Sequence, residues 1–182
     1  EALNRTLSRL DSEKGPTLKT VMVVDSRAAA SLIGRLMRPA NARSVQQGRS
    51  FWTPLIGEKA FSDKLTIIDD PLIKRGLASR HYDSEGISAR ALPIVENGVV
   101  RNIYVDTYYG RKGGMQPTTG SASNRVVSPG EHSLEQLISE VGDGIYVTSW
   151  LGGNADGTTG DFSLGLRGHV IENGEVGRPV GL

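Results

Sequence analysis

Residues 89–105 read ARALPIVENGVVRNIYV, in which two apolar runs flank the tripeptide Glu96-Asn97-Gly98. Asn and Gly tolerate the positive φ angles that both central residues of a type I′ turn require. The stretch therefore predicts a β-hairpin whose strands are residues 89–95 and 99–105. The same signal recurs in residues 170–176, VIENGEV, and predicts a second hairpin near the C-terminal end of the chain.

Further elements are expected on the N-terminal side of the first hairpin. Residues 17–24 predict a strand that leads into an Ala-rich helix, which begins at Ser26 and stops before Pro39. Residues 65–68 predict a short strand that ends at the turn Asp69-Asp70-Pro71, because proline removes a ladder donor and Asp favours turns.

One helix is signalled at both of its ends. Ser133 with Gln136 three residues later has the capping-box pattern, and Gly142 follows the last apolar residue. The apolar stripe between them consists of Leu134, Leu137, Ile138 and Val141. By contrast, residues 44–63 lack periodicity, so we assign no regular element there. We expect their apolar side chains to pack beneath a long loop. These are Phe51, Trp52, Leu55 and Ile56.

Composition narrows the fold class. Gly accounts for 23 of 182 residues, about 12.6%, against an ordinary ~7%, and shows no collagen period. We therefore expect an α+β fold that is β-rich, with a mainly antiparallel sheet or a barrel-like arrangement and a few short helices. The length favours one domain, residues 17–182. Residues 1–16 are expected to be a helix or linker from a preceding domain that the chain lacks.

Charge and cysteine content exclude several classes of protein. The 21 basic and 20 acidic residues leave a net charge of +1, which gives little attraction to nucleic acid or to an anionic membrane. Apolar stretches such as residues 21–24 are far shorter than the ~20 residues of a transmembrane helix. The absence of Cys excludes disulfides, thiolate zinc ligands and Cys nucleophiles. It fits a reducing compartment, and we expect a cytoplasmic protein.

Two segments of the chain are similar to each other. Residues 102–110 read NIYVDTYYG and lead to Thr-Thr-Gly at 118–120, and residues 144–152 read GIYVTSWLG and lead to Thr-Thr-Gly at 158–160. Each copy predicts a strand, a Gly-rich loop and a turn. Because two copies are too few for a solenoid, we expect paired units that share one sheet or barrel, with independent turn chemistry as the alternative. The aromatic residues of the copies are expected to pack in the core, with a peptide groove as the alternative. They are Tyr104, Tyr108, Tyr109, Tyr146 and Trp150.

Candidate catalytic and metal-binding residues are sparse. The three histidines, His81, His132 and His169, are too far apart for a helical metal motif, and no serine-nucleophile or phosphate-loop motif occurs. A possible calcium set does not satisfy the spacing of a calcium loop. It consists of Asn154, Asp156 and Asp161. Four carboxylates near one turn are interpreted as turn residues, with a general acid/base pair as the alternative. They are Asp69, Asp70, Asp83 and Glu85.

A series of short motifs lies in order between residues 17 and 181. They are GRSF at 48–51, IDDP at 68–71, YDSEG at 82–86, VENG at 95–98, TGSA at 119–122, GIYV at 144–147, TGDFS at 159–163 and IENGE at 171–175. Together they resemble the C-terminal domain of the TldD/PmbA family, whose members are called modulators of DNA gyrase and form a two-subunit peptidase system.

The resemblance implies a division between a catalytic and a non-catalytic subunit. A TldD-type subunit carries an HExxxH metal motif on a helix and a Cys ligand towards its C-terminus, and its PmbA/TldE-type partner lacks both. The corresponding segment here, Asp25–Ser31, contains no His, and the chain contains no Cys. The chain therefore resembles the PmbA/TldE side. No catalytic residue and no metal ligand carry over to it, and zinc is expected in the TldD-type partner.

The resemblance also implies a role. We expect a pseudoenzyme subunit of a cytoplasmic metalloprotease heterodimer that cleaves unfolded peptides, bound by strand addition through backbone hydrogen bonds. Peptide contacts are expected at the repeated Gly-rich loops. The residues are Thr119, Gly120, Thr159, Gly160 and Asp161. The alternatives are a homodimeric binding or structural module that cuts nothing, and a hydrolase that uses the four carboxylates.

Overall fold

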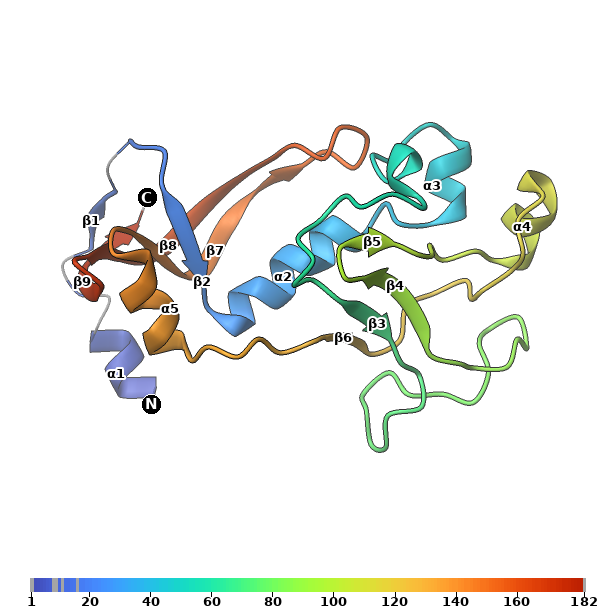
Figure 1. Ribbon diagram of the computed structural model, residues 1–182, viewed down its shortest axis with the longest axis horizontal. Coiled ribbons are helices and arrows are strands. Elements are labelled where there is room, and N and C mark those ends of the chain that lie inside the picture. The colour runs from blue at the N-terminus through green and yellow to red at the C-terminus, as the bar shows by residue number, and fades with distance from the viewer. Residues whose placement is uncertain (1, 8–9, 11, 16, 182) are drawn as a thin grey trace. The chain divides into compact units, whose positions relative to one another are not determined.

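The computed structural model of the chain describes residues 2–7, 10, 12–15 and 17–181 (Figure 1). Its contacts divide the chain into two compact units. Unit 1 takes in the described parts of residues 1–35, 131–156 and 161–182, and unit 2 consists of residues 36–130 and 157–160. The length of the chain favours a single core, but the buried residues are distributed over two units.

Unit 1 contains a five-stranded sheet in the order β1-β9-β8-β7-β2. Its strands are β1 (Glu13–Lys14), β2 (Val21–Val24), β7 (Gly144–Ala155), β8 (Phe162–Glu172) and β9 (Glu175–Gly181). The pairs β7–β8 and β8–β9 are antiparallel, whereas β1 and β2 run parallel to their neighbours at the two edges. The helices that begin in this unit are α1 (Ala2–Leu7), α2 (Ser26–Met37) and α5 (Leu134–Val141).

The core of unit 1 forms where α5 covers the sheet. Ile138 of α5 packs with Val23 of β2 and Ile171 of β8, and all three are buried. The predicted capping box is confirmed, because Gln136 N donates to Ser133 Oγ and Ser133 N donates to the Gln136 side chain. Gly142 ends the helix as predicted.

Unit 2 contains a four-stranded sheet in the order β5-β4-β3-β6. Its strands are β3 (Ile67–Asp69), β4 (Leu92–Glu96), β5 (Val99–Val100) and β6 (Arg125–Val127), and its helices are α3 (Ala42–Gln46), η1 (Thr53–Leu55) and α4 (Thr107–Gly113). The core of the unit is built around Trp52, which is fully buried and donates its indole N–H to the Leu36 carbonyl. The strand residues Ile67, Ile94 and Val95 are also fully buried.

The fold class is confirmed. The described strands form two open, largely antiparallel sheets, so the sheet is found rather than the barrel-like arrangement. Both Asn-Gly hairpins are confirmed as well, with positive φ at Asn97 (48°), Gly98 (80°), Asn173 (53°) and Gly174 (80°). Among the described helices, none is long and apolar enough to cross a membrane.

Several predicted boundaries differ from the structure. The strand predicted over 99–105 ends at Val100, because Arg101 N and Asn102 N both turn back to the Ile94 carbonyl. The helix predicted at the N-terminus ends at Leu7, and Glu13–Lys14 form the strand β1 instead of continuing the helix. Residues 8–9, 11 and 16 of the predicted segment lie outside the described residues. The assignment of no element to residues 44–63 was wrong, because α3 extends to Gln46 and η1 covers Thr53–Leu55. Asn41 caps α3 by accepting from Ser44 N.

The expectation that the two similar segments share one sheet was wrong. Tyr104, in the first segment, makes only an isolated bridge to Asn41 in unit 2, and α4 follows it at Thr107. The second segment begins as the long strand β7 of unit 1, and its turn at residues 157–160 belongs to unit 2. The strand expected in the first copy is thus absent from the sheet that contains β7, and the two copies have different secondary structures.

Candidate functional site

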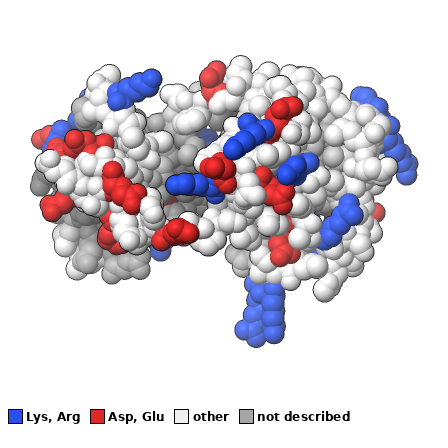
Figure 2. All heavy atoms as spheres, viewed as in Figure 1, with Lys and Arg blue, Asp and Glu red and all other residues white. Residues whose placement is uncertain are grey.

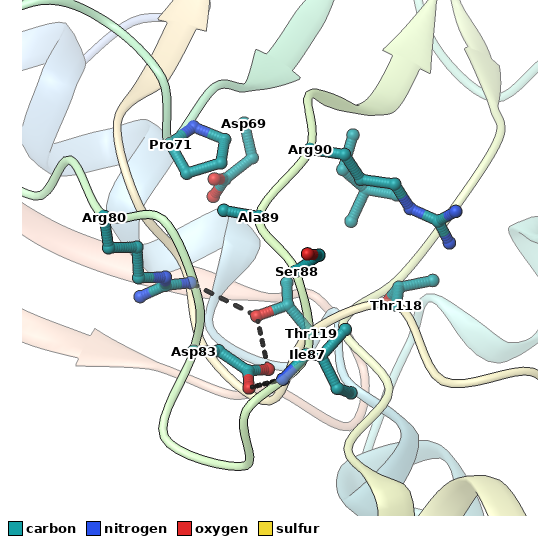
Figure 3. Close-up of a pocket in the computed structure, with 11 residues that line it drawn as sticks. Asp69, Pro71, Arg80, Asp83, Ile87, Ser88, Ala89, Arg90, Thr118 and Thr119 are labelled. Atoms are coloured by element: carbon teal, nitrogen blue, oxygen red, sulfur yellow. Dashed lines mark hydrogen bonds between the residues drawn. The ribbon is translucent and has the colours of Figure 1, made fainter.

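The candidate site of unit 2 is organised by Asp83, which is 5% exposed. Its Oδ1 accepts from Glu85 N (2.9 Å) and Ile87 N (3.0 Å), and its Oδ2 accepts from the Thr119 hydroxyl (3.1 Å) and Gly120 N (3.4 Å). Burial by itself would raise the pKa of Asp83, but these four hydrogen bonds outweigh it and lower the pKa. The carboxylate thus joins its own turn to the loop that contains Thr119 and Gly120 (Figure 3).

Asp69 forms a second buried network in the same unit. It is 2% exposed, and it accepts from Ser123 N (2.8 Å to Oδ2), from the Ser123 hydroxyl and from the Tyr104 hydroxyl (2.6 Å). Burial, followed by the hydrogen bond to Asp69 and the charge of that carboxylate, raises the pKa of Tyr104 above its ordinary value. Tyr104 therefore stays protonated and serves as a fixed donor to Asp69.

Arg80 is linked to Asp83 through the Thr119 hydroxyl. Its guanidinium donates to the Thr119 hydroxyl (3.2 Å), to the Ser121 hydroxyl (3.1 Å) and to the carbonyls of Ser121 and Ala122. Asp69, Arg80, Asp83 and Thr119 line one narrow cavity, which has room for about one water molecule. A cavity of this size does not admit a peptide or another substrate.

The other two predicted carboxylates also hold loops in place. Asp70 Oδ1 accepts from Leu72 N (2.8 Å), which closes an Asx turn. Glu85 accepts from Thr107 N (2.9 Å) and from the Thr107 hydroxyl (2.7 Å), at the first residue of α4. Each of the four carboxylates therefore accepts at least one backbone N–H, which favours the interpretation as turn and cap residues over a general acid/base pair.

A metal ion does not fit the residues that the family motif would require. In the segment Asp25–Ser31, Asp25 accepts from Arg27 N and from the Tyr146 hydroxyl (3.0 Å), and Ala28 is buried with its carbonyl accepting from Trp150 Nε1. Within the described parts of the chain, no three His, Cys, Asp or Glu side chains are grouped so that they could hold a metal ion.

The three histidines are also separated in the structure. His132 pairs with Glu140 (3.0 Å), whereas His169 stacks on the Tyr146 ring with 6.4 Å between ring centroids. His81 is exposed in the loop that leads to Asp83. Their contacts lie in different parts of the fold.

The five predicted peptide-contact residues lie in two separate loops. Thr119 and Gly120 belong to the Asp83 network. Gly160 lies against the Phe51 ring, where an added Cβ would come within 3.2 Å of it, and Phe51 N donates to the Gly157 carbonyl. Thr159 and Asp161 are exposed beside it, at the end of the β7–β8 hairpin. The five residues thus form two groups, a pair that bonds to Asp83 and a group at the end of the β7–β8 hairpin.

Sequence reasoning missed Arg80 and Ser123, and it expected Tyr104 in the core, with a peptide groove as the alternative, but not as a donor to Asp69. Arg80 has no local motif around it, and its partners Thr119 and Ser121 are about forty residues away in sequence. Ser123 lies directly after the TGSA motif, which is the only signal that could have drawn attention to it.

This two-sheet α+β chain matches a family of metallopeptidase domains. The model of the family described as "PmbA/TldA metallopeptidase C-terminal domain" matches residues 17–181. The chain belongs to this family, as the motif resemblance predicts. One similar protein is the metalloprotease PmbA of Escherichia coli O157:H7, which is 33% identical over 182 residues, 99% of this chain and 40% of the relative.

Two solved structures share the fold. A proposed modulator of DNA gyrase from Bacteroides thetaiotaomicron is 37% identical, with a TM-score of 0.94 over 99% of this chain and 41% of that one. TldE from Thermococcus kodakarensis is 22% identical, with a TM-score of 0.83 over 98% of this chain and 45% of that one, which shows the fold alone. The chain thus spans about 40% of the length of the relatives it matches.

Proposed function

We propose that this chain is the C-terminal domain of a PmbA/TldE-like, non-catalytic subunit in a cytoplasmic TldD/TldE-type metalloprotease that cleaves unfolded peptides. The observation that carries the proposal is the segment Asp25–Ser31, which has no His where the catalytic subunit has its HExxxH motif. The absence of Cys from the 182 residues supports it. Zinc and the hydrolytic step then belong to the TldD-type partner in a heterodimer.

The contribution of this chain is to hold peptide and to assemble with the partner. An open strand edge supports the first role. Strand β2 pairs with β7 only over Gly144–Val147, whereas β7 continues to Ala155. In the described part of the chain, no strand pairs with β7 on that side beyond Val147. Backbone groups on this edge can bind an extended peptide of almost any sequence.

Peptide contacts are proposed in the loops that contain Thr119, Gly120, Thr159, Gly160 and Asp161. Thr159 and Asp161 are chosen for the test because their side chains are exposed. Replacing Thr159 and Asp161 with alanine is expected to raise the KM for peptide cleavage by the assembled enzyme. If the double variant folds and cleaves peptide as the wild type does, the contacts lie elsewhere.

The direct test is cleavage of an unfolded peptide by the full-length protein, alone and mixed with a TldD-type subunit from the same source, with zinc content measured in parallel. We expect activity only in the mixture, with zinc following the partner. Cleavage by the full-length protein alone would contradict the proposal. Self-association without any binding of the partner would instead favour the homodimeric module.

A further inference from the structure

The segment between α4 and β6, residues 114–124, is described in full and contains neither a helix nor a strand. Residues 119–122 of this segment, with the sequence TGSA, are called the TGSA loop here. The loop includes Thr119 and Gly120, two of the proposed peptide contacts. Because no ladder of backbone hydrogen bonds fixes the TGSA loop, its conformation depends on side chains that reach it from other segments.

A single guanidinium makes four hydrogen bonds to the TGSA loop. Arg80 Nη2 donates to the Thr119 hydroxyl (3.2 Å) and to the Ser121 carbonyl, and Nη1 donates to the Ser121 hydroxyl (3.1 Å) and to the Ala122 carbonyl (3.3 Å). The planar fork of arginine allows these bonds, whereas the single nitrogen of a lysine cannot span four acceptors. The backbone of Arg80 is anchored as well, because its N–H donates to the Pro71 carbonyl (2.9 Å).

Asp83 holds the same loop together with Arg80. The Thr119 hydroxyl donates to Asp83 Oδ2 (3.1 Å) and accepts from Arg80 Nη2 (3.2 Å), so both roles of the hydroxyl are used inside the protein. Gly120 N also donates to Asp83 Oδ2 (3.4 Å). Gly120 and Ser121 are nevertheless exposed to solvent. The TGSA loop is therefore held by two side chains while part of it remains available to a ligand.

Arg90 is the natural comparison for Arg80, because it lines the same narrow cavity. In the part of the chain that the structure describes, the Arg90 side chain donates no hydrogen bond to the TGSA loop. Figure 3 shows its guanidinium directed away from Asp83 and Thr119, whereas Arg80 is bonded to Thr119. Figure 2 shows basic and acidic side chains interspersed on the visible face of the protein, so a single cation adds little general attraction to a peptide. Hydrogen bonding, not charge, distinguishes the two arginines.

We propose that Arg80 is a positioning residue for peptide binding, which holds the TGSA loop in the conformation in which Thr119 and Gly120 contact the peptide. This inference rests on the proposed function, because the two contacts are part of it. Arg80 itself touches the loop and not the peptide. A loop that is already held loses less conformational entropy when a peptide binds. A loop that samples other conformations binds more weakly, in proportion to the fraction of time it spends in the competent one.

The test is the steady-state kinetics of peptide cleavage by the full-length protein assembled with the TldD-type subunit. Because the hydrolytic step belongs to the partner, Arg80→Ala and Arg80→Lys are both expected to raise KM about 3- to 10-fold with kcat unchanged. Arg80→Lys keeps the charge but not the fork, so it separates hydrogen bonding to the loop from attraction to the peptide. The matched control, Arg90→Ala, is expected to leave KM and kcat at their wild-type values.

A second measurement examines the loop without any peptidase activity. Hydrogen exchange in the full-length protein is expected to accelerate about tenfold at the amides of Gly120 and Ser123 in Arg80→Ala, because loss of the four bonds lets the loop open locally. Arg90→Ala is expected to leave this exchange unchanged. If a folded Arg80→Ala protein exchanges at the wild-type rate, Arg80 does not position the loop, whatever the activity of the variant.

The outcomes separate this inference from the proposed function. If the wild-type assembly cleaves peptide and Arg80→Ala has an unchanged KM, the positioning role fails while the proposed function stands. If the wild-type assembly does not cleave peptide, the proposed function fails and the positioning role with it. A KM raised in Arg80→Ala but not in Arg80→Lys would overturn the inference, since charge alone would then suffice. Should Arg80→Ala not fold, Ser121→Ala removes only the bond to the Ser121 hydroxyl and is expected to raise KM about twofold.

Discussion

The segments 102–120 and 144–160 both contain Ile-Tyr-Val near their start and end in Thr-Thr-Gly, yet they fold differently. In the second segment, β7 runs without interruption from Gly144 to Ala155. In the first, the extended part stops after Val105 and α4 begins at Thr107. Two segments with similar sequences therefore form different secondary structures, the helix α4 in the first and the strand β7 in the second.

The difference arises directly after the shared Ile-Tyr-Val. In the first segment the next residue is Asp106, whose carboxylate accepts from Tyr109 N (2.7 Å) and caps α4. At the same place in the second segment is Thr148, whose hydroxyl donates to the Arg167 carbonyl of β8 (3.2 Å). The capping carboxylate of Asp106 thus starts a helix in the first segment. At the corresponding position of the second segment, Thr148 bonds to the neighbouring strand and β7 continues.

The largest expected difference between the segments concerns their shared tyrosines. Tyr104→Phe removes a donor from Asp69, a carboxylate that is 2% exposed, and is expected to cost about 2 to 3 kcal/mol of unfolding free energy. Tyr146→Phe removes a hydrogen bond to the partly exposed Asp25 and is expected to cost about 0.5 to 1 kcal/mol. Chemical denaturation of both variants measures the two losses.

Asp69→Asn in the Tyr104→Phe background is the control for this comparison. If the tyrosine acts through the charge on Asp69, the two changes are expected to be non-additive. Equal losses for Tyr104→Phe and Tyr146→Phe would show that burial of the carboxylate does not distinguish the two segments.

Features coded by a few adjacent residues could be predicted from the sequence. Both hairpins follow from Asn-Gly, since the turn conformation is set by the two residues themselves. The start of α5 follows from Ser133 and Gln136 for the same reason. By contrast, the capped start of α4 was missed, because Asp106 follows an apolar run that is typical of a strand. The start of the helix is also held by Glu85, which accepts from Thr107, 22 residues further along the chain.

The candidate site was predictable only in part. The four acidic residues were recognised as turn residues, and their bonds to backbone N–H groups agree with this. Their partners were not recognised, because Thr119, Ser123 and Arg80 come from segments that only the tertiary fold brings together. Side chains whose role depends on distant partners have no local periodicity or spacing that would reveal them.

The contribution of the first Thr-Thr-Gly turn to stability is expected to depend on pH. Asp83 bonds to Thr119 and Gly120 of the first turn, and its pKa is lowered in the folded state. The resulting stabilisation is fully present above the unfolded pKa of about 3.9 and is lost as the pH falls through the lower, folded pKa. Asp83→Asn is expected to cost about 1 to 2 kcal/mol at pH 7 and to flatten the acid side of the stability profile.

Urea unfolding between about pH 7 and pH 2 tests this expectation. A profile that Asp83→Asn does not change would mean that the hydrogen bonds of Asp83 do not favour its ionised form.

The smallest expected effect tests the residue at which the two segments diverge. Asp106→Ala removes the cap of α4 and is expected to cost about 1 kcal/mol, whereas Thr148→Ala, at the corresponding position, is expected to cost about 0.5 kcal/mol or less. Hydrogen exchange of the Tyr109 amide, which donates to Asp106, is expected to accelerate in the first variant only. If Asp106→Ala leaves that exchange unchanged, the helix in the first segment is held by Glu85 and Thr107 rather than by its own cap.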